Sequence, residues 1–440
     1  MDNILFYAPK RTNRLIYVLD WVFKERLGVD YQFTDSIEKA TIVYGTLSTL
    51  GNQITIPQAG LLELCVTDGP VENEGYLAPI QSATGTWQQY PVLFYEPAGY
   101  SLPFDILSAI FYLLSRYEEY APNTCFDKHQ RYKASCSILY ELNVLTVPIV
   151  DIWVTHFGTL ITQTLAIQPR YPAFSYIPSY DIDIAYSFLH KGFMRTAGAV
   201  LKNIITGNIS ELKHRYQVNT GAVPDPYDSF STISKLHTHH STKPLFFILS
   251  ALHTTAYDKN ILPHHPAMQQ IIKNIHETGT VGIHPSYYAH NARTFRRELN
   301  VLQSTIRQSI TISRQHYIKF TIPDTYRLLI EQGIDNDYSM GYGTHLGFRA
   351  GTGSSFLWYD LFMDEVTNLR IYPFCFMDTT ALYEQKLSSQ SAFEALSQMQ
   401  QYLMQNHSLL ITIFHNFSLG SAKEWKGWGD AYKQWLKEVK

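Results

Sequence analysis

The chain of 440 residues lacks features that would mark whole classes of protein. No apolar run approaches the roughly 20 residues that a membrane-spanning helix needs, so no membrane span is expected. The first residues, MDNILFYAPK, contain no basic segment followed by an apolar one, which favours a first strand over a signal peptide. On these grounds the sequence predicts a cytoplasmic protein.

Cysteine and net charge are both low. The four cysteines, Cys65, Cys125, Cys136 and Cys375, form no CxxC spacing, which argues against a zinc knuckle and a disulfide framework. We therefore expect reduced, mostly buried thiols. A formal net charge of −3 gives no reason to expect nucleic acid or an anionic membrane as a partner. No GxGxxG or GxxxxGK[ST] motif opens a predicted helix, so a nucleotide-binding fold is not expected.

The length favours more than one domain. Residues 1–170 predict a smaller mixed α/β domain, with strands at residues 4–7 and 41–44 and hairpins and loops from about residue 68 to 98. Helices are expected at residues 13–27, from Pro103 onward and at about residues 147–165. Arg116, Glu118 and Glu119 could form inter-domain ion pairs. The sequence Gln-Pro-Arg-Tyr-Pro at residues 168–172 predicts the junction.

Residues 171–440 repeat one unit, a short apolar strand followed by a stretch long enough for a crossover helix. The clearest helices are predicted at residues 295–310, 323–331 and 390–404. Alternation of strand and helix predicts a parallel sheet, and seven such units can close into a (β/α) barrel. The seven predicted strands are residues 174–183, 245–250, 280–285, 311–316, 334–340, 370–378 and 409–415.

Polar side chains gather at the ends of these predicted strands. Barrel enzymes place their sites at the carboxyl ends of the strands. Each such residue alone could be a helix cap or a partly buried polar group, but together they predict a site. The residues are Asp181, Asp183, His284, Arg314, His316, Asp337, Asp378 and His415.

The residue types indicate metal-assisted hydrolysis. A divalent ion bound by histidine and carboxylate polarises an amide or ester carbonyl and acidifies its bound water. A second carboxylate can act as general base, and a histidine can protonate the leaving group. Asp181 and Asp183 are two residues apart, so on a strand they share a face. They would repel each other unless a cation or a proton lay between them.

The order of these motifs resembles that of the NodB-type polysaccharide deacetylases, carbohydrate esterase family 4. The phrases SYDIDIAYSF, GIHPSY and DYSMGYGTHLGFRAGT are similar to a two-domain bacterial branch of that superfamily. The resemblance implies a distorted seven-stranded barrel. It also implies removal of an N- or O-linked acetyl group from a glycan or glycan precursor, with a metal-bound water as nucleophile. The implied metal is zinc, with cobalt, nickel and manganese as alternatives.

The resemblance assigns roles by position. Asp181 matches the catalytic base, Asp183 the metal-binding aspartate and His284 the first metal histidine. Arg314 matches the arginine that orients the base, and His415 the histidine that acts as acid.

The chain departs from the family pattern at two places. The second metal histidine should lie four residues after His284, where this chain has Tyr288. His290 or His316 could complete the site, or there is no third protein ligand; we favour His316 because it ends a predicted strand. Ile182 separates aspartates that are adjacent in typical members, which leaves the assignment of base and ligand open.

Further candidates for substrate contacts are Asp337, Arg349, Asp378 and Trp425. Arg349 lies in residues 347–352, which are expected either to open a helix that holds a carboxylate or phosphate or to form a structural loop. Trp425 could stack on a sugar ring or close the barrel's end. The rival functions are an inactive deacetylase-like barrel that binds glycans or assembles with partners, and hydrolysis of a non-sugar amide.

Overall fold

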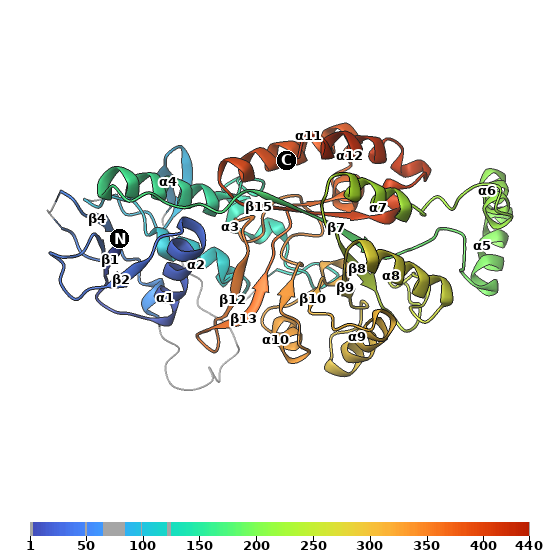
Figure 1. The fold of residues 1–440 in the computed structure, drawn as a ribbon, viewed down its shortest axis with the longest axis horizontal. Helices are drawn as coiled ribbons and strands as arrows, with labels where there is room; N and C mark the ends of the chain where they lie inside the picture. Colours follow the sequence, from blue (N-terminus) through green and yellow to red (C-terminus); the bar gives the residue numbers. More distant parts are fainter. Residues whose placement is uncertain (1–2, 49–50, 65–83, 98, 121–124, 440) are drawn as a thin grey trace.

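The computed structural model describes residues 3–48, 51–64, 84–97, 99–120 and 125–439 (Figure 1). Two sheets of very different size organise these residues. The smaller sheet lies at one end of the long axis of the molecule, within the N-terminal part of the chain. The larger sheet begins at residue 175 and carries every predicted strand of the barrel region.

The smaller sheet has four parallel strands in the order β2-β1-β3-β4. They are β1 (Ile4–Tyr7), β2 (Tyr31–Phe33), β3 (Ile42–Tyr44) and β4 (Ile54–Ile56). The predicted first strand and the helix after it are confirmed, because α1 (Asn13–Leu19) continues as a π-helix, Asp20–Leu27. Thr12 caps α1 by accepting the Leu15 N–H at 3.1 Å, as an N-cap threonine does.

The other described residues of the N-terminal part include a hairpin and three α-helices. The hairpin strands are β5 (Thr84–Trp87) and β6 (Tyr90–Leu93), which confirms that prediction for residues 84–93; residues 68–83 and 98 lie outside the described residues. The helices are α2 (Ile106–Leu114), α3 (Ile138–Glu141) and α4 (Ile149–Leu165). Helix α2 starts at Ile106 and not at Pro103, because Asp105 is its cap and accepts the Ser108 N–H at 2.9 Å.

The larger sheet has nine strands in the order β12-β13-β11-β10-β9-β8-β7-β15-β14. All neighbours are parallel except β12, which runs antiparallel to β13 and was not predicted. The strands are β7 (Ser175–Ile182), β8 (Leu245–Leu249), β9 (Thr280–His284), β10 (Ile312–Ser313), β11 (Asn336–Asp337), β12 (Phe356–Asp360), β13 (Glu365–Ile371), β14 (Phe376–Met377) and β15 (Leu409–His415).

The predicted sixth strand, residues 370–378, is divided between the two ends of this sheet. Its first residues belong to β13, which pairs with β11, and its last residues form β14, which pairs with β15. Between them, the Phe374 N–H donates to Met340 O at 3.1 Å and the next N–H, of Cys375, donates to Ile411 O at 3.3 Å. The stretch between β13 and β14 therefore brings the two edges of the curled sheet together.

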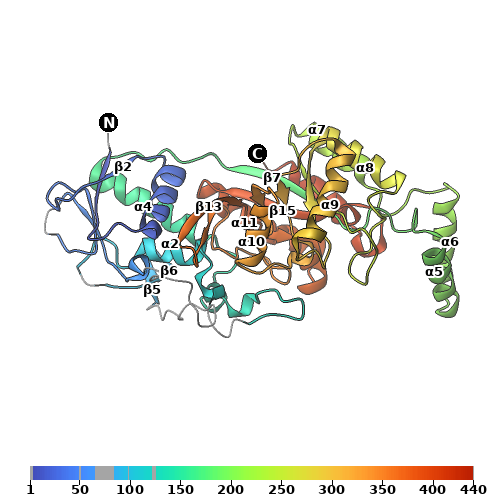
Figure 2. The same ribbon diagram turned by 90° about the horizontal axis from the view of Figure 1, so that it is seen from below.

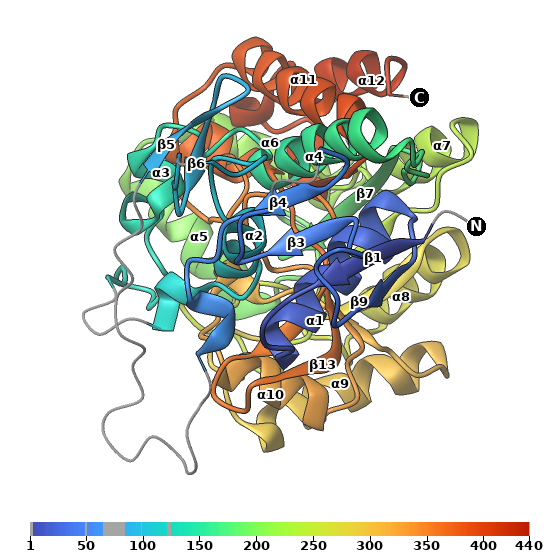
Figure 3. The same cartoon turned by 90° about the vertical axis from the view of Figure 1, so that its left-hand side faces the viewer.

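Helices connect the strands of the larger sheet and surround it. The three clearest predicted helices are confirmed as α9 (Ala292–Ile306), α10 (Asp324–Glu331) and α11 (Ser389–Gln405). Seen end-on, α8 to α12 surround the larger sheet behind the N-terminal strands (Figure 3). The remaining helices are α5 (Phe193–Ile205), α6 (Ile209–Asn219), α7 (Phe230–His239), α8 (Pro266–Thr278) and α12 (Trp428–Leu436).

Residues 347–352 open no helix, contrary to one of the two expectations. The segment runs through turns, with Gly347 at φ +128° and Gly351 at φ +67°, two backbone conformations incompatible with an α-helix. The Gly347 N–H donates to Cys375 O at 2.8 Å, which ties this loop to the closing stretch of the sheet.

Buried charges join the N-terminal part to the loop between β11 and β12. Arg349 donates from Nη2 to Glu119 Oε2 at 2.6 Å and from Nε to Oε1 at 2.9 Å. Arg116 donates to the same Oε1 at 2.8 Å. All three side chains are buried, so the expected pairing of Glu119 across the junction is present in the structure.

Cys125 and Cys136 form a disulfide, so the expectation of reduced thiols was wrong for this pair. The chain reverses between them: an isolated antiparallel bridge joins Phe126 and Tyr132, and the Lys133 N–H donates to Cys125 O at 3.1 Å. Cysteine spacing alone does not reveal such a reversal. Disulfides persist in oxidising compartments, so the cysteines give no support to the cytoplasmic prediction. Cys375 is a buried free thiol, and Cys65 lies outside the described residues.

None of the helices in the described ranges has the length and apolarity that crossing a membrane requires.

Candidate metal centre

The polar residues lie together at the carboxyl ends of neighbouring parallel strands of the larger sheet. Asp181 is the last residue but one of β7, Asp183 is the first residue after that strand, and His284 is the last residue of β9. His316 lies three residues beyond β10, where Tyr317 (φ 61°) and Ile318 (φ 53°) turn the chain sharply. Because these strands run in the same direction, their carboxyl ends meet at one rim.

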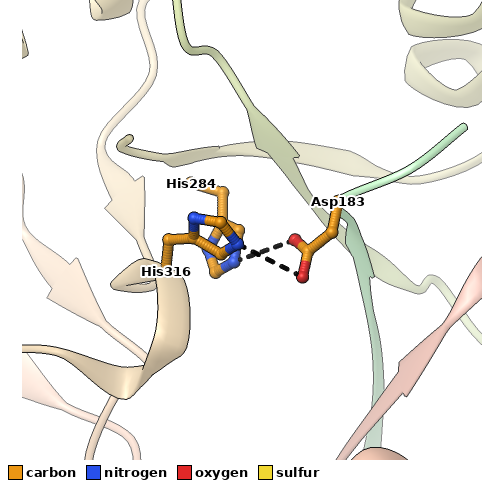
Figure 4. A group of neighbouring side chains, drawn as sticks. All are labelled: Asp183, His284 and His316. Atoms are coloured by element: carbon orange, nitrogen blue, oxygen red, sulfur yellow. Dashed lines mark ion pairs between the residues drawn. The ribbon is translucent and has the colours of Figure 1, made fainter. Parts of the chain in front are cut away.

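Asp183, His284 and His316 converge on one point, as Figure 4 shows. Asp183 Oδ1 lies 3.2 Å from His284 Nε2, and Asp183 Oδ2 lies 3.5 Å from His316 Nε2. One candidate ligand atom from each residue lies within 4.8 Å of the other two. The Oδ1 atom of Asp183 is buried and has no hydrogen-bond partner, which is costly unless a cation or water satisfies it.

Hydrogen bonds fix the orientation of both imidazole rings. His284 Nδ1 donates to the carbonyl oxygen of Arg314 at 2.6 Å, and His316 Nδ1 donates to Asp258 Oδ1 at 3.1 Å. Both acceptors carry no hydrogen, so each Nδ1 carries the proton and each Nε2 of a neutral ring presents its lone pair to Asp183. Metal-binding histidines are held by this kind of bond. The donor set therefore fits a divalent ion.

The electrostatics of the group call for positive charge beside Asp183. Burial raises the pKa of Asp183, but His316 and His284 outweigh burial and bring this pKa well below its ordinary value. Burial lowers the pKa of His316, but the charges of Asp183 and Asp258 and their hydrogen bonds to the ring outweigh burial and raise this pKa to about 9. Without a metal, a proton on His316 supplies the balancing charge, and a cation would have to displace that proton.

Arg314 holds Asp181 beside this group. The buried guanidinium donates from Nη1 to Asp181 Oδ1 at 2.8 Å and from Nη2 to Ser179 Oγ at 2.8 Å. Its Nε donates to Tyr338 O at 3.0 Å, so the side chain is fixed at three points. The other carboxylate oxygen, Asp181 Oδ2, lies 3.7 Å from His284 Nε2 and faces the metal group.

His415 approaches Asp183 from the opposite side. It ends β15, directly opposite Asp181 of β7 in the sheet. Asp378 accepts both the backbone N–H of His415 and its Nδ1–H, each at 2.7 Å. Burial lowers the pKa of His415, but Asp378 and Asp183 outweigh burial and raise this pKa well above its ordinary value. His415 Nε2 lies 3.4 Å from Asp183 Oδ2, so this ring nitrogen faces the candidate metal centre.

These groups line one cavity of about 290 Å³. Its walls include the aromatic side chains Tyr257, Tyr317, Tyr383 and Phe417. Arg131, from the part of the chain before the larger sheet, also lines it and donates from Nη1 to Tyr317 O at 3.0 Å. The N-terminal part therefore contributes to the cavity wall.

Several predicted residues lie elsewhere. His290 lines a neighbouring cavity and is not in the metal group. Asp337 is buried among Ser313 and Ser339, whose hydroxyls both donate to it, and Arg349 is engaged by Glu119. Trp425 is 1% exposed because Phe417, Tyr383 and Trp428 surround its ring. None of these four lines the cavity, and Asp378 acts on His415.

Asp258 and Arg131 are two charged residues of the site that sequence reasoning missed. Asp258 lies in a turn nine residues after β8, where the Thr255 hydroxyl donates to Oδ2 and the Tyr287 N–H donates to Oδ1. No motif spacing marks it. The sequence indicates a site residue only where an aspartate lies at the end of a predicted strand. Asp258 lies in a loop well beyond β8, and the fold of that loop brings it to His316.

Comparison with known proteins gives matches of two kinds. A family of unknown function, DUF7033, matches residues 4–166, and no curated protein matches the chain. The similar solved structures include a polysaccharide deacetylase candidate from Mycobacterium smegmatis, which is 12% identical with a TM-score of 0.39 over 61% of this chain and 84% of that one. They also include the polysaccharide deacetylase Bc1974 from Bacillus cereus (12% identity, TM-score 0.29, 60% and 87%).

A third similar structure is BA3943 from Bacillus anthracis, described as a CE4 family pseudoenzyme. It is 11% identical, with a TM-score of 0.28, and the match covers 49% of this chain and 58% of that one. The neighbours thus include both deacetylases and a pseudoenzyme, and identities this low transfer no activity to the chain.

Proposed function

We propose that this protein is a metal-dependent hydrolase that removes an acetyl group, N- or O-linked, from a glycan or glycan precursor. The observation that carries the proposal is the convergence of three groups on one cavity. These are the ligand set around Asp183, the carboxylate of Asp181 held by Arg314, and the imidazole of His415 held by Asp378. Each group has the chemistry that one part of acyl hydrolysis needs.

Asp183, His284 and His316 are the residues that would hold the metal. Two imidazole nitrogens and one carboxylate oxygen are a typical set for catalytic zinc, which keeps a further position open. Bound there, the ion would polarise the acyl carbonyl and lower the pKa of water. Zinc is the first ion to test, because this donor set is typical of catalytic zinc. Cobalt, nickel and manganese accept similar donors and are the alternatives.

Asp181 is proposed as the general base. Arg314 binds Oδ1 of this carboxylate, which leaves Oδ2, on the side of His284, to accept a proton from the attacking water. Asp183 has the unpartnered oxygen and lies beside both His284 and His316, which favours it as the ligand of the pair.

His415 is proposed as the general acid. Asp378 fixes Nδ1 as the protonated nitrogen and raises the pKa, so Nε2 carries a second proton that it can give to the departing amine or alcohol. The aromatic walls of the cavity suit a sugar ring, because aromatic faces pack against the apolar faces of sugars. The glycan class itself rests on the resemblance of the motifs to NodB-type deacetylases.

The test is metal analysis of the purified protein, followed by measurement of acetate released from acetylated chitooligosaccharides and acetylated xylan. The proposal predicts about one divalent ion per chain and acetate release that Asp181→Asn abolishes. A protein that binds no divalent ion and releases no acetate, but binds the glycan, would instead be the inactive binding module.

We also propose a domain boundary near residue 170, as the DUF7033 match and the separation of the two sheets support.

A further inference from the structure

The hairpin formed by α5 and α6 has an apolar surface that nothing in the described chain covers. It stands away from the body of the molecule in two perpendicular views (Figures 1 and 2). The five most exposed large apolar side chains among the described residues all belong to it: Phe193 (84%), Met194 (82%), Ile205 (76%), Ile209 (75%) and Tyr216 (70%). Surfaces of this kind mark interaction sites.

The apolar residues of α5 form one continuous face. At 100° per residue, its large side chains and Ala197 fall within an arc of ~140°. Arg195 and Lys202 lie outside this arc, ~80° and ~60° beyond its Ile205 edge, so these cations flank the apolar face. The hairpin is held together by a different face, where buried Asn203 donates from Nδ2 to Glu211 Oε1 at 3.1 Å. The apolar face therefore points outward and does not join the two helices.

The hairpin is basic, although the whole chain is not. Residues 190–219 contain one carboxylate, Glu211, and five cationic side chains, Lys191, Arg195, Lys202, Lys213 and Arg215. Counting five positive charges and one negative gives a local charge of +4, against −3 for the full chain. Glu211 is occupied by Asn203 and lies 3.6 Å from Arg215, while Lys202 and Lys213 are exposed.

We propose that this hairpin binds the surface of an anionic phospholipid bilayer. The exposed apolar side chains would insert between the headgroups, while Lys202 and Lys213 contact lipid phosphates, as in other basic amphipathic interfacial helices. A second copy of the chain is a poorer occupant, because the same positively charged hairpin would have to face itself. The net charge of the chain gave no sign of this partner, since the basic residues are concentrated in one element.

The position of the hairpin relates this surface to the cavity. Helix α5 begins ten residues after Asp183, and the hairpin is inserted between β7 and α7. The hairpin is therefore attached to the segment that follows the carboxyl end of β7, at the rim where Asp183 lies. The bound hairpin would keep that rim at the lipid surface. The binding itself does not depend on the proposed hydrolysis.

Cosedimentation of the full-length protein with vesicles tests the proposal. Vesicles of phosphatidylcholine with phosphatidylglycerol are compared with vesicles of phosphatidylcholine alone. We expect the protein to partition about tenfold more into the anionic vesicles, and added salt to weaken this binding. Phe193→Gln combined with Met194→Gln should reduce binding about tenfold or more. The matched control is Met363→Gln, which changes a side chain that is 61% exposed between β12 and β13, and it should bind as the wild type does.

A charge variant separates the two contributions. Lys202→Gln combined with Lys213→Gln should remove most of the preference for anionic vesicles. Wild type that stays in the supernatant with both vesicle types overturns the proposal, as does equal binding of both types or unchanged binding by the Phe193 and Met194 variant. A wild-type dimer by light scattering that this variant converts to a monomer, without vesicle binding, would assign the face to a second copy. Circular dichroism checks that each variant is folded.

Discussion

Replacing Asp258 by asparagine tests whether a carboxylate outside the ligand set controls the candidate metal centre. Asp258 Oδ1 accepts the Nδ1–H of His316 at 3.1 Å and the N–H of Tyr287 at 2.9 Å. Asparagine has nearly the same shape, and its oxygen can still accept both bonds, but it carries no negative charge. Loss of such a partner typically lowers metal affinity about 10- to 100-fold, which corresponds to about 1.4–2.7 kcal/mol. We expect a loss in that range for zinc binding by Asp258→Asn.

Competition between the protein and a zinc chelator of known affinity measures the effect at constant pH. His316→Ala should lose more affinity than Asp258→Asn, because it removes the ligand itself. His290→Ala is the matched control, since His290 is exposed and lines the neighbouring cavity, and it should bind zinc as the wild type does. Wild-type affinity in both His316→Ala and Asp258→Asn would refute the assignment of His316, and a loss confined to His290→Ala would transfer it to that residue.

Four further outcomes follow from the geometry. Asp181→Asn should lower acetate release about 10²–10⁴-fold with metal content unchanged, and equal turnover would remove Asp181 from the mechanism. Asp378→Asn should lower the pKa of His415, so the alkaline limb of the rate–pH profile should move to lower pH; an unmoved limb would contradict the acid role. Glu119→Gln should cost about 3–5 kcal/mol of unfolding free energy in urea, because it leaves the buried Arg349 without its carboxylate. The control Glu25→Gln, which breaks the half-exposed pair with Arg370, should cost less than about 1 kcal/mol, and equal losses would show that burial of the pair is irrelevant. Burial raises the pKa of Glu119, but Arg349 and Arg116 outweigh burial and lower this pKa below 4.5. The stability that the Glu119 carboxylate contributes is therefore complete above pH 4.5 and is lost as the pH falls further. Unfolding measured at a series of pH values should show a smaller loss of stability in acid for Glu119→Gln than for the wild type.

Strands with a long apolar run were predictable from the sequence. The predicted strand at residues 409–415 coincides with β15, because seven residues of one apolar run are all paired with β7. The sixth predicted strand was one run of the same kind, yet it is divided between β13 and β14. An apolar run indicates that residues are buried, not which strand they pair with. The residues between the two sheet edges are buried but do not all pair with one strand, so the run was predicted as a single strand.

The candidate site was predictable only where a side chain lies at a strand end or within three residues of one, as His316 does after β10. Asp181, Asp183, His284 and His415 lie within one residue of a strand end. Asp258 and Arg131 come from loops, and their positions depend on contacts with His316 and Tyr317, which are distant in the sequence. Trp425 and Arg349 were of types suited to substrate binding, but aromatic packing and a buried ion pair occupy them. Residue type cannot distinguish these uses.

The divided strand that joins the two edges of the larger sheet has a mechanical consequence for the acid. Asp378, which accepts two hydrogen bonds from His415, is the residue after β14. The carboxylate that orients the proposed acid is therefore attached to the strand that follows the stretch joining the two sheet edges. Any movement that releases β14 from β15 would withdraw the carboxylate from both His415 bonds at once. Separation of β14 from β15 and loss of both hydrogen bonds that orient His415 would then be a single event, and hydrogen exchange of the backbone amides at this strand pair would report on it.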